Sequence, residues 1–480
     1  MRKGWMVLLA MALVVALAVP ASAEMKLNGF YRVKPTLSNY VGNGNNSLNV
    51  PGMETTIAAT SLVKTGTSGI ETDRARSFTE MRVRNRFEVG DENVKGVTFF
   101  ELDGNFGDLG GRVGRNQGFA SNGDSINLET KNAFVWFKMP NLPLEFTVGL
   151  QGYLDEFGGL LFGWSDQAGV VANYKADSVG LRFTWLKLRD DISVAGTGST
   201  QNNWASSNPG GKEADYYAID AKFVPSKDVN ATLHFGAIYD RGIPFTFVTQ
   251  PTEAAPSHTR LASYYVGANA TFKFAPATLH GGFLYNFGSF TEPTETVDIG
   301  GYAVRLRADG NVGPGKAFLE GLYVSGDDNI SDLKYKSIVT GSDYAALTSF
   351  YFSPDLTILF PNIDMINSAT ALVLNPNNGG RGLWLLAGGY SQKFTDRISA
   401  KVGAGYLAAD KKRRSSTTTE AKGTGMGTEI NGNVNVNLAK GLDFGVYGAY
   451  AFLGNFYDRD PAQAQPLDLY TLFGRLNFAF

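Results

Sequence analysis

Strict alternation of apolar and polar side chains is the dominant pattern of this chain, and residues 470–480 give its clearest case. One face of this segment carries Tyr470, Leu472, Gly474, Leu476, Phe478 and Phe480. The other face is mostly small or polar, so the segment is predicted to be a β-strand with one apolar and one polar side. An aromatic strand at a free sheet edge would favour aggregation, whereas a strand that closes a barrel has no free edge and can face lipid. The pattern therefore favours a membrane barrel over the last strand of a secreted β-sandwich.

A second alternating segment, residues 78–89, indicates which face of the strands is wet. Its apolar face carries Met81, Val83, Phe87 and Val89, and its polar face carries Glu80, Arg82, Arg84, Arg86 and Glu88. Asn85 is the one exception to the alternation. An arginine on the lipid face of a barrel costs ~2–4 kcal/mol at the bilayer midplane. The three arginines are therefore predicted to point into a polar lumen.

Turn signals divide the rest of the chain into strands with alternately short and long connections. Short Gly, Pro and Asp turns follow every second strand, for example at residues 139–143 and 225–228, and the other connections are long. This asymmetry is typical of a transmembrane barrel with short periplasmic turns and longer surface loops. The expected fold is all-β, a single transmembrane antiparallel barrel of about eighteen strands, with a range of about 16 to 20. A connection at residues 327–382 could hold one more hairpin, although Pro354 and Pro361 favour a folded surface loop.

The first 23 residues have the organisation of a secretory signal peptide. Arg2 and Lys3 precede an apolar run over residues 5–19, and a small-residue cleavage motif ends at Ala23. The apolar run is shorter than the roughly 20 residues that a spanning helix needs. We expect cleavage after Ala23, export across the inner membrane, and a barrel formed by residues 24–480.

Composition agrees with a barrel whose apolar face is hidden by alternation. The chain has 57 Gly, 33 Phe and 21 Tyr, yet its mean hydropathy is −0.12. Of 43 basic side chains, cleavage removes Arg2 and Lys3, so 41 remain against 45 acidic ones and the formal net charge is −4. This balance gives no nucleic-acid-binding footprint. The absence of cysteine excludes disulfides, thiolate metal sites and haem attachment, and no cofactor or metal is expected.

Barrel closure would bring basic residues of three strands together on the inner wall. These are Arg32, Lys34, Arg82, Arg84, Arg86 and Arg475, and a second inward pair, Arg305 and Arg307, lies elsewhere in the chain. One interpretation is a field across the pore that favours anions. The other is that these groups pair with Glu80, Glu88, Glu101 and Asp103 and stiffen the wall. Both interpretations can hold at once.

The signal peptide, the alternating strands and the terminal aromatic residue together resemble the outer-membrane porins of Gram-negative bacteria. The motif that carries this resemblance at residue level consists of Leu472, Leu476, Phe478 and Phe480. In that family such a motif marks the last strand for the barrel-assembly machinery. The resemblance implies a pore of 16 to 18 strands in the outer-membrane lipid bilayer, often as a homotrimer. The inward arginines also resemble the charged lumen of the alginate-exporter branch.

The connection at residues 153–168 is too apolar for a solvated loop. It carries Leu160, Leu161, Phe162 and Trp164 close together. In general porins the third surface loop folds inward and narrows the pore, and the resemblance implies the same role here. Asp155, Glu156 and Asp166 would then form a negative pole opposite the basic residues. The alternative is a strand that continues above the membrane, with Gly158 and Gly159 as a bulge.

These observations predict a passive channel for small hydrophilic, anionic solutes. Two alternatives stay open: export of an acidic polysaccharide, and a barrel that holds a partner protein without transporting anything. His234 and His280 share inward parity and could meet at one metal, but a lone histidine more often has an ordinary hydrogen-bond partner. No nucleophile motif of the G-x-S-x-G type lies near either histidine, so an enzyme is not expected.

Overall fold

The computed structural model describes most of the chain from Glu24 onwards. The described residues are 24–39, 76–107, 119, 128–191, 212–241, 260–291, 295–329, 332–344, 349–352, 354–366, 371–412, 423–457 and 468–480. The expected signal peptide, residues 1–23, lies outside them. Among the described residues, no helix is long and apolar enough to span a membrane.

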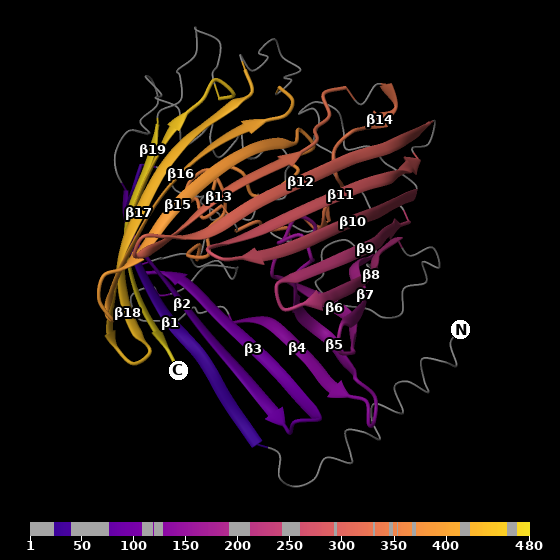
Figure 1. The fold of residues 1–480 in the computed structure, drawn as a ribbon, viewed down its shortest axis with the longest axis horizontal. Coiled ribbons are helices and arrows are strands. Elements are labelled where there is room, and N and C mark those ends of the chain that lie inside the picture. The colour runs from indigo at the N-terminus through magenta and orange to yellow at the C-terminus, as the bar shows by residue number, and fades with distance from the viewer. Residues whose placement is uncertain are drawn as a thin grey trace.

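Within the described residues, nineteen strands form one continuous sheet that closes on itself and is antiparallel apart from one short strand (Figure 1). The strands are β1 Glu24–Ser38, β2 Arg76–Gly90, β3 Val94–Asn105, β4 Leu128–Lys138, β5 Leu144–Tyr153, β6 Ser165–Lys175, β7 Val179–Asp191, β8 Lys212–Ser226, β9 Val229–Asp240, β10 Arg260–Phe274, β11 Ala277–Thr291, β12 Thr296–Val312, β13 Gly315–Val324, β14 Lys334–Tyr335, β15 Leu383–Lys393, β16 Ile398–Ala409, β17 Gly425–Ala439, β18 Leu442–Leu453 and β19 Leu469–Ala479. Each wall strand pairs with its neighbours in sequence, and β19 closes the barrel against β1. The two-residue β14 runs parallel to β12, outside this order. The remaining eighteen strands make the wall, which confirms the predicted fold and strand count.

Alternation places apolar side chains outside and polar ones inside, as β1 illustrates. Leu27 and Tyr31 are exposed on the outer face, whereas Lys34 and Ser38 are buried on the inner face. The outer face also carries a row of touching aromatic rings on β8 to β11. These are Tyr217, Tyr239, Tyr264 and Phe287. A band of apolar side chains with an aromatic row suits a wall that faces hydrocarbon and its interface with water.

Connections at one end of the barrel are short turns, such as those between β6 and β7 and between β8 and β9. Most connections at the other end are long, although the one between β11 and β12 has only four residues, and two of the long ones turn into the barrel. The first joins β5 to β6, and the second joins β13 to β15 and contains β14 and the 3-10 helix Gly341–Asp343. Their apolar residues form the buried core together with the inner faces of the strands. These two loops therefore fill much of the interior of the barrel.

Candidate functional site in the barrel lumen

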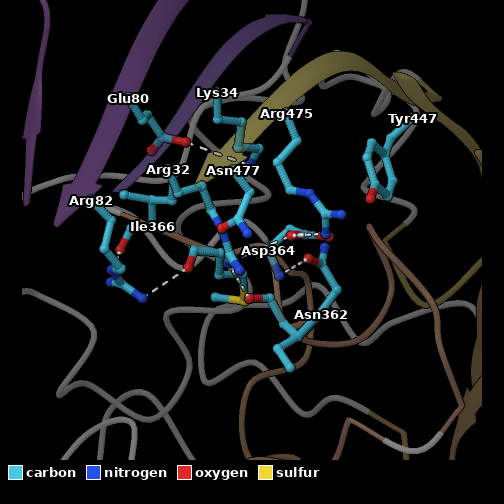
Figure 2. Close-up of polar contacts among 12 residues, drawn as sticks. Arg32, Lys34, Glu80, Arg82, Asn362, Asp364, Ile366, Tyr447, Arg475 and Asn477 are labelled. Atoms are coloured by element: carbon cyan, nitrogen blue, oxygen red, sulfur yellow. Dashed lines mark hydrogen bonds and ion pairs between the residues drawn. The ribbon is translucent and has the colours of Figure 1, made fainter. Parts of the chain in front are cut away.

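Four arginines from three adjacent strands point to one region of the lumen. Arg32 on β1 lies directly opposite Arg82 on β2, and β19 brings Arg475 to the other side of β1 (Figure 2). Arg84 follows Arg82 on the same face of β2. We call these four residues, together with Lys34, the basic wall. Like charges directly opposite each other destabilise a sheet, so the arrangement needs compensating carboxylates.

Compensating carboxylates lie on the neighbouring strands. Asp103 on β3 accepts two hydrogen bonds from Arg82, at 2.8 and 2.6 Å. Arg84 pairs with Glu101, which lies on β3 like Asp103. Lys34 lies 3.4 Å from Glu80 in a pair that is almost fully buried. The basic side chains therefore stiffen the wall through ion pairs while they also face the lumen.

The remaining predicted basic residues lie apart from the basic wall. Arg86 pairs with Glu88 at 2.9 Å, and its side chain is more exposed than those of Arg82 and Arg84. Arg305 and Arg307 on β12 share one buried carboxylate, Glu320 of β13, at 2.9 Å each. These residues form two separate ion-pair groups, away from the point where Arg32, Arg82 and Arg475 meet.

Residues 354–366, which we call the inner loop, lie inside the barrel. The sequence favoured a folded surface loop here, and that expectation is wrong because the segment is strongly apolar. Leu356, Ile358, Leu359 and Phe360 are at most 1% exposed. The described residues of this loop form no hairpin strands. Burial of four large apolar side chains favours the inward position by ~1.5–3 kcal/mol for each side chain.

One carboxylate of the wall holds the backbone of the inner loop. Glu429 on β17 is buried and accepts hydrogen bonds from the N–H groups of Thr357, Ile358 and Leu359, at 2.6, 2.9 and 2.9 Å. These donors have left water, and an unsatisfied buried N–H is costly. Lys401 on β16 adds an ion pair with Asp355. The loop is thus fastened to β16 and β17, a few strands from β19, where its other end binds arginines.

The tip of the inner loop binds the basic wall (Figure 2). The Asp364 carboxylate lies 3.0 Å from the Arg475 guanidinium and 3.5 Å from that of Arg32. Backbone carbonyl groups next to Asp364 accept further hydrogen bonds. Arg32 donates to Ile363 O at 3.2 Å, and Arg82 donates to Ile366 O at 2.7 Å and to Met365 O at 3.2 Å. The loop tip therefore lies against the inner wall and ends on the arginines of β1, β2 and β19.

The β5–β6 connection, residues 154–164, also lies inside, but its charges differ from expectation. Asp155 was expected to oppose the basic residues across the pore. Its carboxylate is buried and accepts four backbone N–H bonds from its own loop, at 2.5 to 2.9 Å. Burial raises the pKa of Asp155, and these N–H bonds oppose that rise. Asp155 shapes its own loop, and the loop carboxylate that contacts the basic wall is Asp364.

The other residues expected at the constriction have separate positions. Glu156 pairs with Arg182 at 3.0 Å, and Asp166, already on β6, pairs with Lys131 at 2.8 Å. Phe162 is fully buried in the interior cluster, whereas Trp164 is 66% exposed. The alternative of a continuing strand with a glycine bulge is also wrong, because β5 ends at Tyr153.

The two inward loops touch each other through backbone groups and one serine hydroxyl. Leu161 O accepts hydrogen bonds from the Gly341 N–H at 3.0 Å and from Ser349 Oγ at 2.5 Å. Gly159, at φ +99°, and Gly163 lie so close to Phe350 O that a Cβ atom at either position would overlap it. Only glycine allows this approach, because it lacks a Cβ atom. The loops form one layer in the lumen.

The histidines that could have shared a metal have separate partners. His234 Nδ1 lies 2.6 Å from the Asp220 carboxylate. His280 Nδ1 lies 3.0 Å from Thr271 Oγ1, and its Nε2 lies 3.5 Å from Asp309. Each imidazole ring thus contacts polar side chains of the strands next to its own.

Comparisons with known proteins give the fold. No protein-family model and no curated protein matches the sequence. Solved structures do match: Acinetobacter baumannii OccAB1 is 11% identical with a TM-score of 0.52, and the match covers 95% of this chain and 96% of that one. Acinetobacter baumannii OccAB4 is 11% identical with a TM-score of 0.51, covering 95% and 98%. Pseudomonas aeruginosa OccK2, solved in complex with glucuronate, is 10% identical with a TM-score of 0.50, covering 95% and 98%. At this identity the likeness shows a shared barrel fold.

Proposed function

We propose that this chain is an outer-membrane porin, a passive diffusion channel for small hydrophilic, anionic solutes. The observation that carries the proposal is the convergence of Arg32, Arg82 and Arg475 on one point of the lumen. Guanidinium groups bind carboxylates and phosphates with directed, charge-assisted hydrogen bonds. A polar lumen inside an apolar outer wall suits passage of water-soluble molecules through a bilayer.

Carboxylates are the anions that this lumen suits best. OccK2, which shares the fold, was solved with glucuronate, a sugar that carries one carboxylate. We therefore infer that sugar acids and similar small carboxylates are the solute class. The ionisable groups of the lumen are arranged in ion pairs, and this arrangement is compatible with a transport role. We further propose that Leu472, Leu476, Phe478 and Phe480 direct the chain to the barrel-assembly machinery, as their resemblance to the porin motif implies.

The test is the ion preference of a double variant. Arg32→Gln with Arg475→Gln should shift the reversal potential under a KCl gradient toward cation preference, because two lumen charges are lost while polar side chains remain. The shift should shrink at high salt, since the Debye length falls from about 10 Å at 0.1 M to about 3 Å at 1 M. The measurement is single-channel recording of purified protein in planar bilayers.

A matched control removes two positive charges elsewhere on the inner wall. Lys26 and Lys95 lie near the turn end of β1 and β3, and their side chains are 57% and 37% exposed. Lys26→Gln with Lys95→Gln should change the reversal potential less. If the arginine variant assembles and keeps the wild-type reversal potential at low salt, the anion assignment is wrong.

A further inference from the structure

We propose that Asp364 is a built-in competitor for the solute: its carboxylate occupies the Arg32–Arg475 pair, and a permeating carboxylate passes by taking its place. This inference rests on the proposed function and adds to it a residue that sets affinity. In this proposal, a negative charge on the inner loop, and not one on the wall, controls the passage of anions.

Asp364 is bound as a solute carboxylate would be. One of its oxygens is shared between the Arg475 and Arg32 guanidinium groups, at 3.0 and 3.5 Å. Its side chain is 8% exposed, against 17% and 14% for the two arginines. Asn362 Oδ1 accepts the Asp364 N–H at 2.7 Å, and this short turn directs the carboxylate to the wall. The chain's own aspartate thus shows that one carboxylate fits the arginine pair.

The arginines keep their places without Asp364. Arg32 Nε donates to Asn477 Oδ1 at 3.3 Å, and Arg475 also pairs with Asp443 of β18 at 2.9 Å. Both partners belong to wall strands. Arg475 Nε is buried and donates to no acceptor among the residues that the structure describes. The pair is therefore preorganised, with a donor to spare, for a carboxylate that replaces the aspartate.

Contacts other than the Asp364 carboxylate hold the loop in place, so the charge can be removed without moving the loop. The neighbouring carbonyl groups of Ile363, Met365 and Ile366 bind Arg32 and Arg82 without a carboxylate. Glu429 holds the loop from its far side. A neutral side chain at position 364 should therefore leave the loop inside the barrel. The Ile363 side chain, 72% exposed although its loop lies inside, indicates open space beside the site for the rest of a solute.

A competitor that occupies the binding site lowers apparent affinity by the fraction of sites it leaves free. Asp364→Asn removes the carboxylate and keeps the size of the side chain. The half-blocking concentration of glucuronate should fall by about tenfold or more, because charge-assisted hydrogen bonds are the strong ones. The measurement is the block of KCl current through the full-length barrel by glucuronate, with glucose as the uncharged match.

Asp443→Asn is the control for charge alone, because Asp443 contacts the same arginine at a similar distance but belongs to the wall. It should lower the half-blocking concentration by less than threefold. Equal shifts in the two variants, or a shift for glucose as large as that for glucuronate, would overturn the competitor role. An anion-selective wild type with equal shifts would reject this inference and leave the proposed function intact.

Cysteine chemistry gives a second measurement, in which two reagents are compared on one variant. The natural chain has no cysteine, so Asp364→Cys carries one thiol. This variant should bind glucuronate as tightly as Asp364→Asn does. A methanethiosulfonate reagent with a negative sulfonate should then return weak binding, whereas a neutral reagent of the same class should not. Equal effects of the two reagents would count against the competitor.

Discussion

Replacing Glu429 with alanine is expected to free the inner loop from the wall and to raise single-channel conductance roughly twofold or more. The change removes the acceptor of three backbone N–H groups, those of residues 357–359. Each buried donor without an acceptor costs about 1–3 kcal/mol, so three of them offset a large part of the burial free energy that holds the loop inward. The loop should leave the lumen for part of the time, and the cross-section should widen.

Glu429→Gln is the matched control for this prediction. Its amide oxygen can still accept backbone N–H bonds, so the loop should stay in place more often and the conductance should rise less. Planar bilayer recording of both variants measures the difference. An alanine variant with wild-type conductance and wild-type current noise would mean that the loop does not narrow the pore, or that its apolar contacts alone hold it.

Deleting Phe480 should lower the amount of assembled barrel by roughly tenfold or more. The residue exchanges two backbone hydrogen bonds with Gly29, at 3.1 Å each, where β19 closes against β1. Its ring also lies 6.0 Å from that of Tyr31 and 5.8 Å from that of Phe478 on the outer face. Loss of two hydrogen bonds and one apolar ring amounts to about 2–4 kcal/mol, and each 1.4 kcal/mol is a factor of ten.

Substitutions at position 480 distinguish the effect of losing the aromatic ring from the effect of shortening the chain. Phe480→Tyr keeps the ring and both backbone bonds and should assemble normally, whereas Phe480→Asp keeps the length and should assemble poorly. Membrane fractionation with heat-dependent gel mobility measures folded barrel, and the periplasmic fraction reports export. Normal membrane yield of the deletion would show that neither closure nor recognition depends on this residue.

The barrel could be predicted from the sequence because a period of two is a local signal. The alternation within each strand separates its two faces. An arginine such as Arg82 identifies the inner face, because a charged side chain on the outer face would be costly in lipid. Parity also gave the direction of Arg32 and Arg475. It could not give their partners, because Asp364 reaches them from a loop more than a hundred residues away from either β1 or β19 in sequence.

The interior loops could be predicted only in part. The apolar run in residues 153–168 correctly indicated burial, since a solvated loop rarely carries so many large apolar residues. The similar run at residues 356–360 gave the same signal, but two prolines directed attention to a surface loop. Glu429 offered no signal, because an inward glutamate on a strand looks like any lumen charge. Its role depends on backbone donors that only the folded loop brings to it.

The seam at Phe350, where Gly159 and Gly163 meet a carbonyl group, joins the loops mainly through backbone groups, and Ser349 Oγ adds one hydrogen bond to Leu161 O. The calibre of the lumen at that level therefore depends chiefly on how closely the two backbones approach, and any residue larger than glycine at position 159 or 163 would force the loops apart. Ion preference depends instead on a few basic side chains of β1, β2 and β19, which substitution can change. Size exclusion and charge preference are therefore separable traits of this barrel, and one can drift or be engineered while the other stays fixed.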